Sequence, residues 1–382
     1  MVSEAYIVGA VRSPVGKRNG GLSAVHPADL ASQVLQELIV RTSVDPAAVE
    51  DVIMGCVSQV GPQTADIART AWLSAGLPES VPGVTIDRQC GSSQQAVHFA
   101  AQAVLSGTQD IVIAAGVENM SMVPMGSTVA LHKQGMALPF GQGWHDRYGD
   151  QEISQFRGAQ LMCEKWGIKR AELEEYSLES HSRAIRAIDE GRFAREIIPV
   201  GGLTTDEGPR RDSTLEKMAE LQPLRPGWEL TAATASQISD GSAAVLIASA
   251  NAVRRHGFAP RARVHAMAVT GADPVFMLTG PIPATERVLE KGHLTIDDID
   301  VFEVNEAFAP VPIAWARDTG ASLEKTNPNG GAIALGHPLG GTGAILMTKL
   351  LHELERTGGR YGLQTMCEGG GQANATIIER LA

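Results

Sequence analysis

The chain alternates between short β-branched apolar runs and longer stretches rich in alanine and leucine. The short runs predict buried strands and the Ala/Leu-rich stretches predict helices. This alternation is typical of an α/β fold. The predicted strands are residues 4–11, 51–58, 110–116, 243–249, 261–269 and 300–308.

Two segments far apart in the chain follow one pattern. Residues 36–59 and 286–308 each read as a helix, a break, a helix-starting aspartate and an acidic step into an apolar strand. Both halves then continue through a small-residue helix into another strand. We therefore predict a duplicated α/β domain, and two unrelated βαβ segments remain the alternative.

The stretch between the two repeats differs in character. It is rich in Met, Gly and charge at first and helical later, and long insertions on a rigid scaffold tend to carry binding. We predict that it covers a site. The expected organisation is an N-terminal core of residues 1–117 and 240–258, a loop domain of residues 118–239, and a C-terminal core of residues 259–382.

Length and composition agree with a globular protein of two or three domains. The 382 residues are too many for one ordinary core, and 43% are hydrophobic while 20% are charged. A formal net charge of −11 disfavours nucleic acid or an anionic membrane as the main partner. An anionic ligand would therefore require a local basic pocket.

The N-terminal residues lack the long apolar segment of a signal peptide, and no apolar run approaches membrane-spanning length. We expect a cytoplasmic protein without a membrane partner. The four cysteines form no CxxC pair and show no histidine spacing typical of zinc, so we expect neither a metal site nor a disulfide framework. They are Cys56, Cys90, Cys163 and Cys367.

Cys90 stands where an apolar β-like run meets a small-residue helix. A thiol at a helix N-terminus faces unpaired N–H groups and the positive end of the helix dipole, which predicts a lowered pKa. The alternative is a buried packing residue, because cysteine is among the residues most often buried. A catalytic role also requires a base.

His337 is the strongest candidate base among the ten histidines. Six glycines lie within residues 330–343, so the backbone there can approach a ligand closely. The following Pro338 holds His337 in an extended or turn conformation. The alternative is a histidine that merely packs in a glycine-rich turn; His98, within the small-residue helix, we interpret as a core histidine.

Cys367 and Asn305 each end a predicted strand of the second half. The duplication places Cys367, like Cys90, beside a strand end, so one thiol can be a nucleophile while the other carries a proton. An adventitious disulfide is the alternative. An amide at Asn305 can orient a water or polarise a carbonyl, although asparagine at a strand end is often a turn residue.

Together these residues resemble the thiolase family, the acyltransferases that cleave or form 3-ketoacyl-CoA. The resemblance covers essentially the whole chain. It implies two βαβαβαββ core domains packed as five α/β/α/β/α layers, with a loop domain over the active site. The matching motifs are CGSSQQA (90–96), VNEAFA (304–309), GGAIALGHPLGGTGA (330–344) and CEGGG (367–371).

The resemblance implies a role for each matching residue. Cys90 corresponds to the acylated nucleophile, His337 to its base, and Cys367 to the acid/base that handles the α-carbon proton and the CoA thiol. Asn305 corresponds to the residue whose water forms one oxyanion hole with His337. The backbone N–H groups of Cys90 and Gly369 correspond to a second hole.

The resemblance also implies CoA as co-substrate, without a metal or other cofactor. Arg210 and Arg211 lie where family members contact the nucleotide end, and a solvated loop pair is the alternative for them. Ser236 aligns with a serine that contacts pantetheine. Part of residues 120–145 resembles a tetramerisation region, which implies a homotetramer built as a dimer of dimers.

The chain departs from the common family pattern at several places. Ser93 and Glu368 stand where smaller residues are common, and residues 232–240 read AATASQISD. The resemblance also implies that a pantetheine-covering element of many biosynthetic relatives is replaced near residues 152–160. Several segments are most similar to actinobacterial thiolases associated with steroid ring degradation, which points to a bulky or acidic acyl group.

We therefore expect thiolytic cleavage of a 3-ketoacyl-CoA to acyl-CoA and acetyl-CoA by a ping-pong mechanism through an acyl-cysteine, in lipid or steroid degradation. A biosynthetic acetoacetyl-CoA thiolase and another condensing enzyme of this fold are alternatives, and a non-catalytic acyl-CoA binder is a third. Cys367 favours the thiolase, because other condensing enzymes of this fold typically lack a second cysteine.

Overall fold

The computed structural model describes residues 4–381. Its N-terminal half builds five strands of a mixed sheet around two parallel pairings, β3 with β4 and β3 with β5. Strand β6 runs antiparallel to both β5 and β1. The strands of this half, in spatial order, are β4 (Gly83–Ile86), β3 (Asp51–Gly55), β5 (Ile111–Asn119), β6 (Ser239–Ser249) and β1 (Ala5–Arg12), with the short β2 (Gly16–Lys17) beside β6.

The C-terminal half repeats this topology. The outer pairings of β7 with β10 and of β10 with β9 are antiparallel, and β9 with β8 is parallel. A parallel bridge between Phe302 and Thr326 takes the place that β4 has in the first half. The predicted duplicated α/β fold is confirmed. The strands, in spatial order, are β7 (Ala262–Gly271), β10 (Gln372–Arg380), β9 (Tyr361–Glu368) and β8 (Val301–Val304).

The two half-sheets are continuous with each other. Tyr6 of β1 pairs with Arg263 of β7, and Ile7 pairs with Ala262. Ten strands in residues 4–381 therefore form one sheet.

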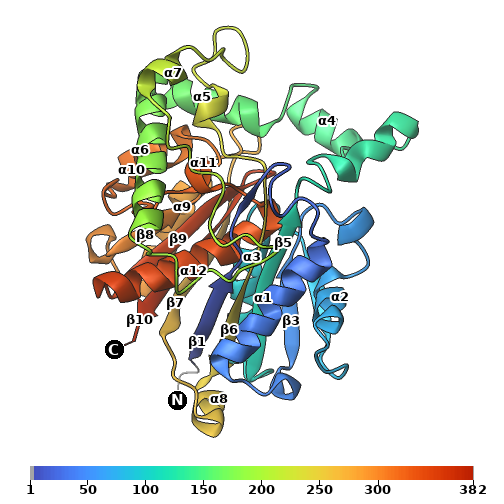
Figure 1. Ribbon diagram of the computed structural model, residues 1–382. Helices are drawn as coiled ribbons and strands as arrows, with labels where there is room; N and C mark the ends of the chain where they lie inside the picture. Colours follow the sequence, from blue (N-terminus) through green and yellow to red (C-terminus); the bar gives the residue numbers. More distant parts are fainter. Residues whose placement is uncertain (1–3, 382) are drawn as a thin grey trace.

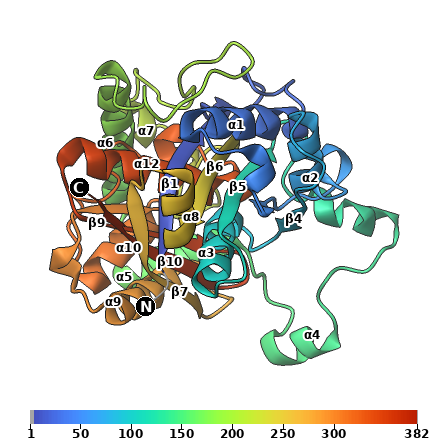
Figure 2. The same ribbon diagram turned by 90° about the horizontal axis from the view of Figure 1, so that it is seen from below.

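Helices form three layers around the two half-sheets (Figures 1 and 2). Helices α1 and α2 cover the outer face of the N-terminal half, and α9 and α10 cover that of the C-terminal half. Helices α3 and α12 pack on each other between the halves. The bounds are α1 (Pro27–Thr42), α2 (Ile67–Ser74), α3 (Ser92–Leu105), α9 (Pro281–Gly292), α10 (Pro310–Thr319) and α12 (Leu339–Thr357), with α8 (Ala250–His256) linking β6 to β7 and the single turn α11 (Ala332–Leu335) preceding α12.

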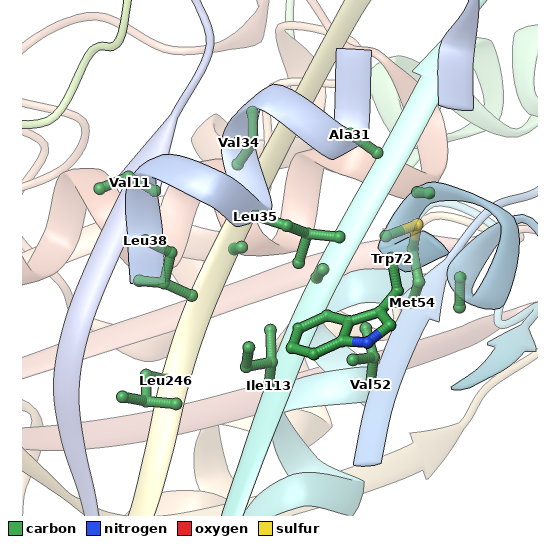
Figure 3. Close-up of a cluster of buried hydrophobic side chains, with 14 of the residues drawn as sticks. Val11, Ala31, Val34, Leu35, Leu38, Val52, Met54, Trp72, Ile113 and Leu246 are labelled. Carbon is green, nitrogen blue, oxygen red and sulfur yellow. The ribbon is translucent and has the colours of Figure 1, made fainter. Parts of the chain in front are cut away.

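The side chains of β3 alternate between two hydrophobic cores on opposite faces of the sheet. Val52 and Met54 point into the outer core with Leu35 and Trp72, as Figure 3 shows. Ile53 points the other way, into the core between α3 and α12. Successive side chains of a strand face opposite sides of its sheet, so this half-sheet is buried on both faces.

The segment between β5 and β6 is the predicted cover. Its helices α5 and α6 lie against α10 and α11 of the C-terminal half, whereas α4 and the chain around it project from the body in both ribbon views (Figures 1 and 2). The domain boundaries given above stay a prediction, and residues 1–3 and 382 lie outside the described residues. The helices of the segment are α4 (Gln142–Tyr148), α5 (Gln155–Trp166), α6 (Arg170–Asp189) and α7 (Leu215–Ala219).

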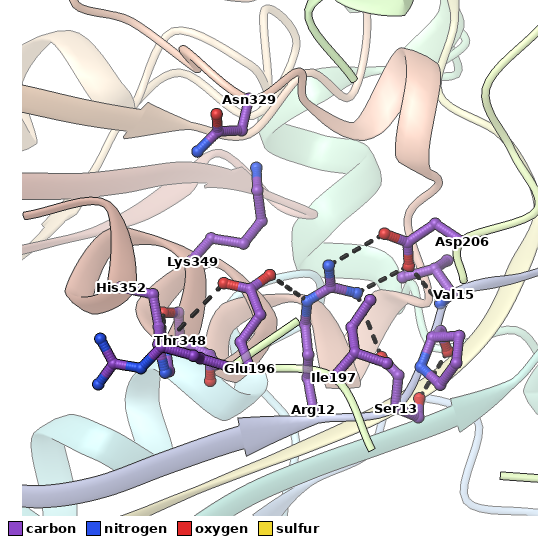
Figure 4. Close-up of polar contacts among 12 residues, drawn as sticks. Arg12, Ser13, Val15, Glu196, Ile197, Asp206, Asn329, Thr348, Lys349 and His352 are labelled. Atoms are coloured by element: carbon purple, nitrogen blue, oxygen red, sulfur yellow. Dashed lines mark hydrogen bonds and ion pairs between the residues drawn. The ribbon is translucent and has the colours of Figure 1, made fainter. Parts of the chain in front are cut away.

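A buried arginine ties this segment to β1 (Figure 4). Arg12 is fully buried and donates from Nε to Glu196 at 2.7 Å and from both Nη atoms to Asp206 at 2.7 and 3.0 Å. Asp206 also accepts the N–H of Val15 at 2.7 Å. A buried charge is tolerated only where it is paired in this way, so the contacts fix the path of the cover segment over the sheet. Within residues 4–381, no helix has both the length and the apolar character to cross a membrane.

Candidate active site

Cys90 lies in the short connection between β4 and α3, as the sequence pattern predicts. Gln89 before it has a φ of 49°, which turns the backbone sharply ahead of the helix. The Ser92 hydroxyl accepts the N–H of Arg88 at 2.9 Å and donates to the Gln89 carbonyl at 2.5 Å. These bonds fix the turn that carries the thiol.

The predicted low pKa of Cys90 is wrong for the free protein. Burial, and after it the negative charge of Glu368, raise the pKa of this thiol to about 12. Desolvation disfavours a thiolate, and here it outweighs the N–H groups at the start of α3. Cys90 is therefore a thiol at neutral pH and needs a base to become a nucleophile.

His337 follows the turn α11 and is 4% exposed. Its Nδ1 lies 2.6 Å from the Thr342 hydroxyl, and its backbone N–H donates to the Gln237 carbonyl at 3.1 Å. Burial lowers the pKa of the imidazole to about 4, so the ring is neutral. If Nδ1 carries the proton and donates it to Thr342, Nε2 carries the lone pair that can accept a proton.

Asn305 follows β8 directly and is fully buried. Its amide Nδ2 lies 3.4 Å from His337 Nε2, and its backbone N–H donates to the Thr365 carbonyl at 3.1 Å. Its Oδ1 has no hydrogen-bond partner among residues 4–381. The structure thus brings the two predicted residues together and leaves one amide oxygen available.

Cys367 lies near the end of β9, opposite Ala373 of β10, and is 1% exposed. Burial raises the pKa of this thiol well above its usual value, and a charge on Cys90 raises it further. The thiol is therefore a proton donor at neutral pH rather than a second thiolate. Cys56, Cys90, Cys163 and Cys367 are all free thiols in this structure.

The end of β9 packs against the turn that carries Cys90. A Cβ built on Gly369 would lie 2.8 Å from Gln89 Oε1, and one built on Gly91 would lie 1.8 Å from Glu368 Oε1. A larger residue at either position would have to displace the side chain of Gln89 or of Glu368. The two halves of the chain therefore meet where their candidate thiols stand.

Ser93 links the two central helices. Its hydroxyl accepts the N–H of Ala344 in the first turns of α12 at 2.8 Å. A Cβ on Gly343 would lie 2.2 Å from the backbone nitrogen of Gln94. The start of α12, which follows His337, is thus held against the start of α3, which follows Cys90.

The three candidate CoA residues occupy different surroundings. Arg210 lines a cavity of about 170 Å³ together with His181 and Lys217. Arg211 instead forms an exposed ion pair with Asp189 at 2.9 Å. Ser236 donates its backbone N–H to the carbonyl of Ala307, two residues after Asn305, at 3.0 Å. The cavity lining thus contains Arg210 and Lys217, with Lys217 paired to Asp212 at 3.1 Å, whereas Arg211 is not part of it.

Sequence reasoning missed several residues that hold the site. Gln237 anchors the His337 loop, because its Nε2 donates to the carbonyls of Gly208, Ile333 and Ala334 at 2.9–3.0 Å. Thr342, which contacts His337, lies within the glycine-rich motif of residues 330–344, and this position was a signal for it.

Two buried glutamates also hold loops of the site in place. Glu118 accepts N–H groups of Val57 at 2.9 Å, Ser58 at 3.0 Å and Gly340 at 3.1 Å. Glu306 accepts the hydroxyls of Tyr176 and Ser180 at 2.8 and 2.7 Å. Glu306 lies within the motif VNEAFA, which was its signal in the sequence. Within residues 4–381, no group of three or more His, Cys, Asp or Glu side chains has an arrangement suited to a metal ion.

Family models match nearly the whole chain. The thiolase N-terminal domain matches residues 5–251, and the thiolase C-terminal domain matches residues 258–380. Among curated proteins, the steroid 3-ketoacyl-CoA thiolase FadA6 of Mycobacterium tuberculosis is 60% identical, over 100% of this chain and 95% of its own. A β-ketoadipyl-CoA thiolase of Pseudomonas aeruginosa is 44% identical over 100% of both chains.

Solved structures agree. Human mitochondrial 3-ketoacyl-CoA thiolase in complex with CoA superposes with a TM-score of 0.90 at 36% identity, covering 100% of this chain and 99% of that one. The acetyl-CoA acetyltransferase of Bacillus anthracis gives a TM-score of 0.91 at 38% identity, with coverage of 100% and 99%.

Proposed function

The chain belongs to the thiolase family of acyltransferases, and we propose that it cleaves a 3-ketoacyl-CoA from steroid degradation with CoA, releasing acetyl-CoA and a shortened acyl-CoA. The observation that carries the proposed chemistry is that the turn of Cys90 meets the end of β9, where Cys367 lies. In addition, His337 Nε2 lies 3.4 Å from Asn305 Nδ2. The steroid assignment rests on the 60% identity to a steroid 3-ketoacyl-CoA thiolase.

Acylation begins with proton transfer. Because the pKa of Cys90 is about 12 and that of His337 about 4, a preformed thiolate–imidazolium pair is disfavoured in the free protein. The proton passes from Cys90 to Nε2 of His337 as the sulfur attacks the 3-keto carbon. The alkoxide that forms is held by the backbone N–H groups of Cys90 and Gly369, each worth about 3–4 kcal/mol.

Carbon–carbon cleavage then expels the enolate of acetyl-CoA. His337, now protonated, and a water held by Asn305 stabilise the enolate oxygen, and Cys367 donates its proton to the α-carbon. The thiolate left on Cys367 takes the proton of an incoming CoA thiol. That thiol attacks the acyl-cysteine, and Cys90 leaves and recovers its proton from His337, which closes a ping-pong cycle.

CoA binding is supported by the CoA complex of the human mitochondrial relative. We place the phosphates of CoA at the cavity of Arg210 and Lys217 and the pantetheine near Ser236. Local cations of this kind offset the formal net charge of −11. Arg211 contributes only if it leaves Asp189.

We also propose a cytoplasmic homotetramer. Free cysteines agree with a reducing compartment. The chain around α4, which projects from the body, exposes several apolar side chains, and exposed apolar surface marks association sites. A dimer of dimers would bury them: Val129, Leu131, Met136, Leu138 and Phe140.

The test supplies the purified protein with CoA and a panel of 3-ketoacyl-CoA thioesters: ring-derived, β-ketoadipyl and acetoacetyl. We expect CoA-dependent release of acetyl-CoA, with the highest kcat/KM for a ring-derived substrate, and an acyl adduct located on Cys90 by mass spectrometry. Cys90→Ala should abolish both. Cys163→Ala is the matched control, because this buried cysteine of α5 lies outside the proposed chemistry.

The absence of any adduct and of any cleavage across the panel would refute the thiolase chemistry. A higher kcat/KM for β-ketoadipyl-CoA or acetoacetyl-CoA would refute the steroid assignment alone. The β-ketoadipyl arm is included because relatives of that activity are 44% identical over the full length.

A further inference from the structure

Glu368 is a buried acid that the proposed mechanism does not use. It is the last residue of β9, it is 0% exposed, and neither carboxyl oxygen has a hydrogen-bond partner among residues 4–381. Buried carboxyl groups are almost always paired, because an unpaired buried charge is costly. Glu368 is an exception to this rule, and it lies beside the proposed nucleophile.

The carboxyl lies directly over the turn of Cys90. A Cβ on Gly91 would stand 1.8 Å from Glu368 Oε1 and 2.5 Å from its carboxyl carbon. The residue before Gly91 is the nucleophile, and the residue before Glu368 is Cys367. The Glu368 carboxyl therefore lies against the turn of Cys90, and a negative charge on it acts on both Cys90 and Cys367.

The charged groups around it do not neutralise it. The turn after β4 contributes Arg88, whose Nη1 is engaged with Gln372 of β10 at 2.9 Å, and also Asp87 and Cys90. Glu118 of β5 adds a further negative charge near Cys90. From β9 comes Cys367, and β10 offers the uncharged Gln372 and Asn374 opposite the strand end.

Burial raises the pKa of Glu368 to about 8, although the charge of Arg88 and the backbone N–H of Asn374 act in the opposite direction. The acid is thus mostly protonated at neutral pH. The negative charge of Glu368, once formed, is the largest electrostatic contribution that raises the pKa of Cys90. Two adjacent carboxylate and thiolate charges in a desolvated site oppose each other.

We infer that Glu368 is a positioning residue for the nucleophile: its carboxyl must hold a proton when Cys90 ionises, and its own ionisation at alkaline pH keeps Cys90 in the thiol form. The inference rests on the proposed role of Cys90 as nucleophile. It adds a residue outside the Cys–His–Cys–Asn set, at a position where this chain departs from the common family pattern.

The test measures the rate at which iodoacetamide alkylates Cys90 between pH 6 and 10, followed on the Cys90 peptide by mass spectrometry. No substrate is present, so failure of the thiolase assay leaves this result unaffected. Wild type and Glu368→Gln should react at the same rate at pH 6, where both side chains are neutral. At pH 9.5 the variant should react about threefold to tenfold faster, because each unit of pKa changes the thiolate fraction tenfold.

A ratio of the two rates that stays constant from pH 6 to pH 10 would overturn the inference, since a merely structural change has no reason to follow the titration of one carboxyl. Glu353→Gln is the matched control: this buried acid of α12 bonds Asn329 at 2.8 Å and Arg356 at 2.7 Å. Its ratio to wild type should stay constant with pH.

Arg88→Gln provides an independent arm should Glu368→Gln fail to fold, as judged by loss of its thermal transition. Removing the Arg88 cation raises the pKa of Glu368. The ratio of the Cys90 alkylation rate to that of a free thiol should therefore begin to fall at a higher pH than in the wild type. A downward or absent displacement in a folded Arg88→Gln protein contradicts the inference.

Discussion

Asn305 Nδ2 lies 3.4 Å from His337 Nε2. The residue that follows β8 therefore faces the imidazole ring of the residue in the loop after α11. With Thr342 at 2.6 Å from Nδ1, both ring nitrogens of His337 have a partner. The ring orientation is fixed before substrate arrives, which is the condition for a base that acts without reorganisation.

Asn305→Ala removes the group proposed to hold the water of the enolate hole. We expect kcat for thiolysis to fall about a hundredfold with KM nearly unchanged, because loss of one such donor typically costs 10²–10³. Steady-state kinetics with CoA and a 3-ketoacyl-CoA measures it. Asn251→Ala, at an exposed residue of α8, serves as the control, and a kcat within twofold of wild type for Asn305→Ala would contradict the role.

Thr342→Val keeps the shape of the side chain but removes the hydroxyl that pairs with His337 Nδ1. We expect kcat to fall about tenfold, since the tautomer with a free Nε2 is no longer favoured. Thr342→Ser should recover most of the rate. Equal rates for the Val and Ser variants would show that packing, not the hydrogen bond, matters at this position.

Cys367→Ala separates the two halves of the reaction. The variant should still accept an acyl group on Cys90 from a reactive thioester, but carbon–carbon cleavage should be lost, because no thiol remains to protonate the α-carbon. Intact-mass measurement follows the first reaction and acetyl-CoA release follows the second. Cleavage at the wild-type rate would exclude Cys367 as the proton donor.

Gly91→Ala introduces a methyl group 1.8 Å from Glu368 Oε1. We expect a lower melting temperature and slower alkylation of Cys90, since backbone and carboxyl cannot both stay in place. Gly143→Ala is the matched control, because a Cβ there meets nothing within 4 Å. Replacing Glu368 by Ala in the Gly91→Ala protein should restore stability; no recovery would place the strain elsewhere.

The buried pair of Lys349 and Glu303 supports the His337 loop from below. Lys349 Nζ lies 2.9 Å from Glu303 and donates to the Gly330 carbonyl at 2.7 Å, and both side chains are at most 1% exposed. Glu303→Gln should destabilise the protein by about 3–5 kcal/mol in urea unfolding, because it leaves a buried cation unpaired. Lys349→Met combined with Glu303→Leu should cost less than either single variant; a strictly additive result would deny the coupling.

The sequence allowed the fold and the candidate chemistry to be predicted where local pattern decides. The Cys90 turn, the glycine-rich loop of His337 and the strand end of Cys367 each carry a signal within a few residues. The predicted strand 300–308 was too long, because the chain leaves the sheet at Asn305 and β8 ends at Val304. Strand β10 was not among the predicted strands, since polar Asn374 and Thr376 interrupt its apolar run.

Other features depend on contacts between distant residues and have no local signal. The pKa of Cys90 rises because of burial and Glu368, which is 278 positions away in the chain. The ion pair that draws Arg211 to Asp189 depends on the path of α6. The pairing of Tyr6 with Arg263 depends on how two separately formed half-sheets meet.

That joint between β1 and β7 also bears on how a large substrate enters and leaves. Two pairs of strand residues and the shared layer of α3 and α12 bind the halves into one body. Hinged domain closure around a ligand, common where two domains meet at a small interface, is therefore not a motion open to this architecture. We therefore expect entry of the proposed 3-ketoacyl-CoA substrate, and release of the product, to depend on the segment between β5 and β6.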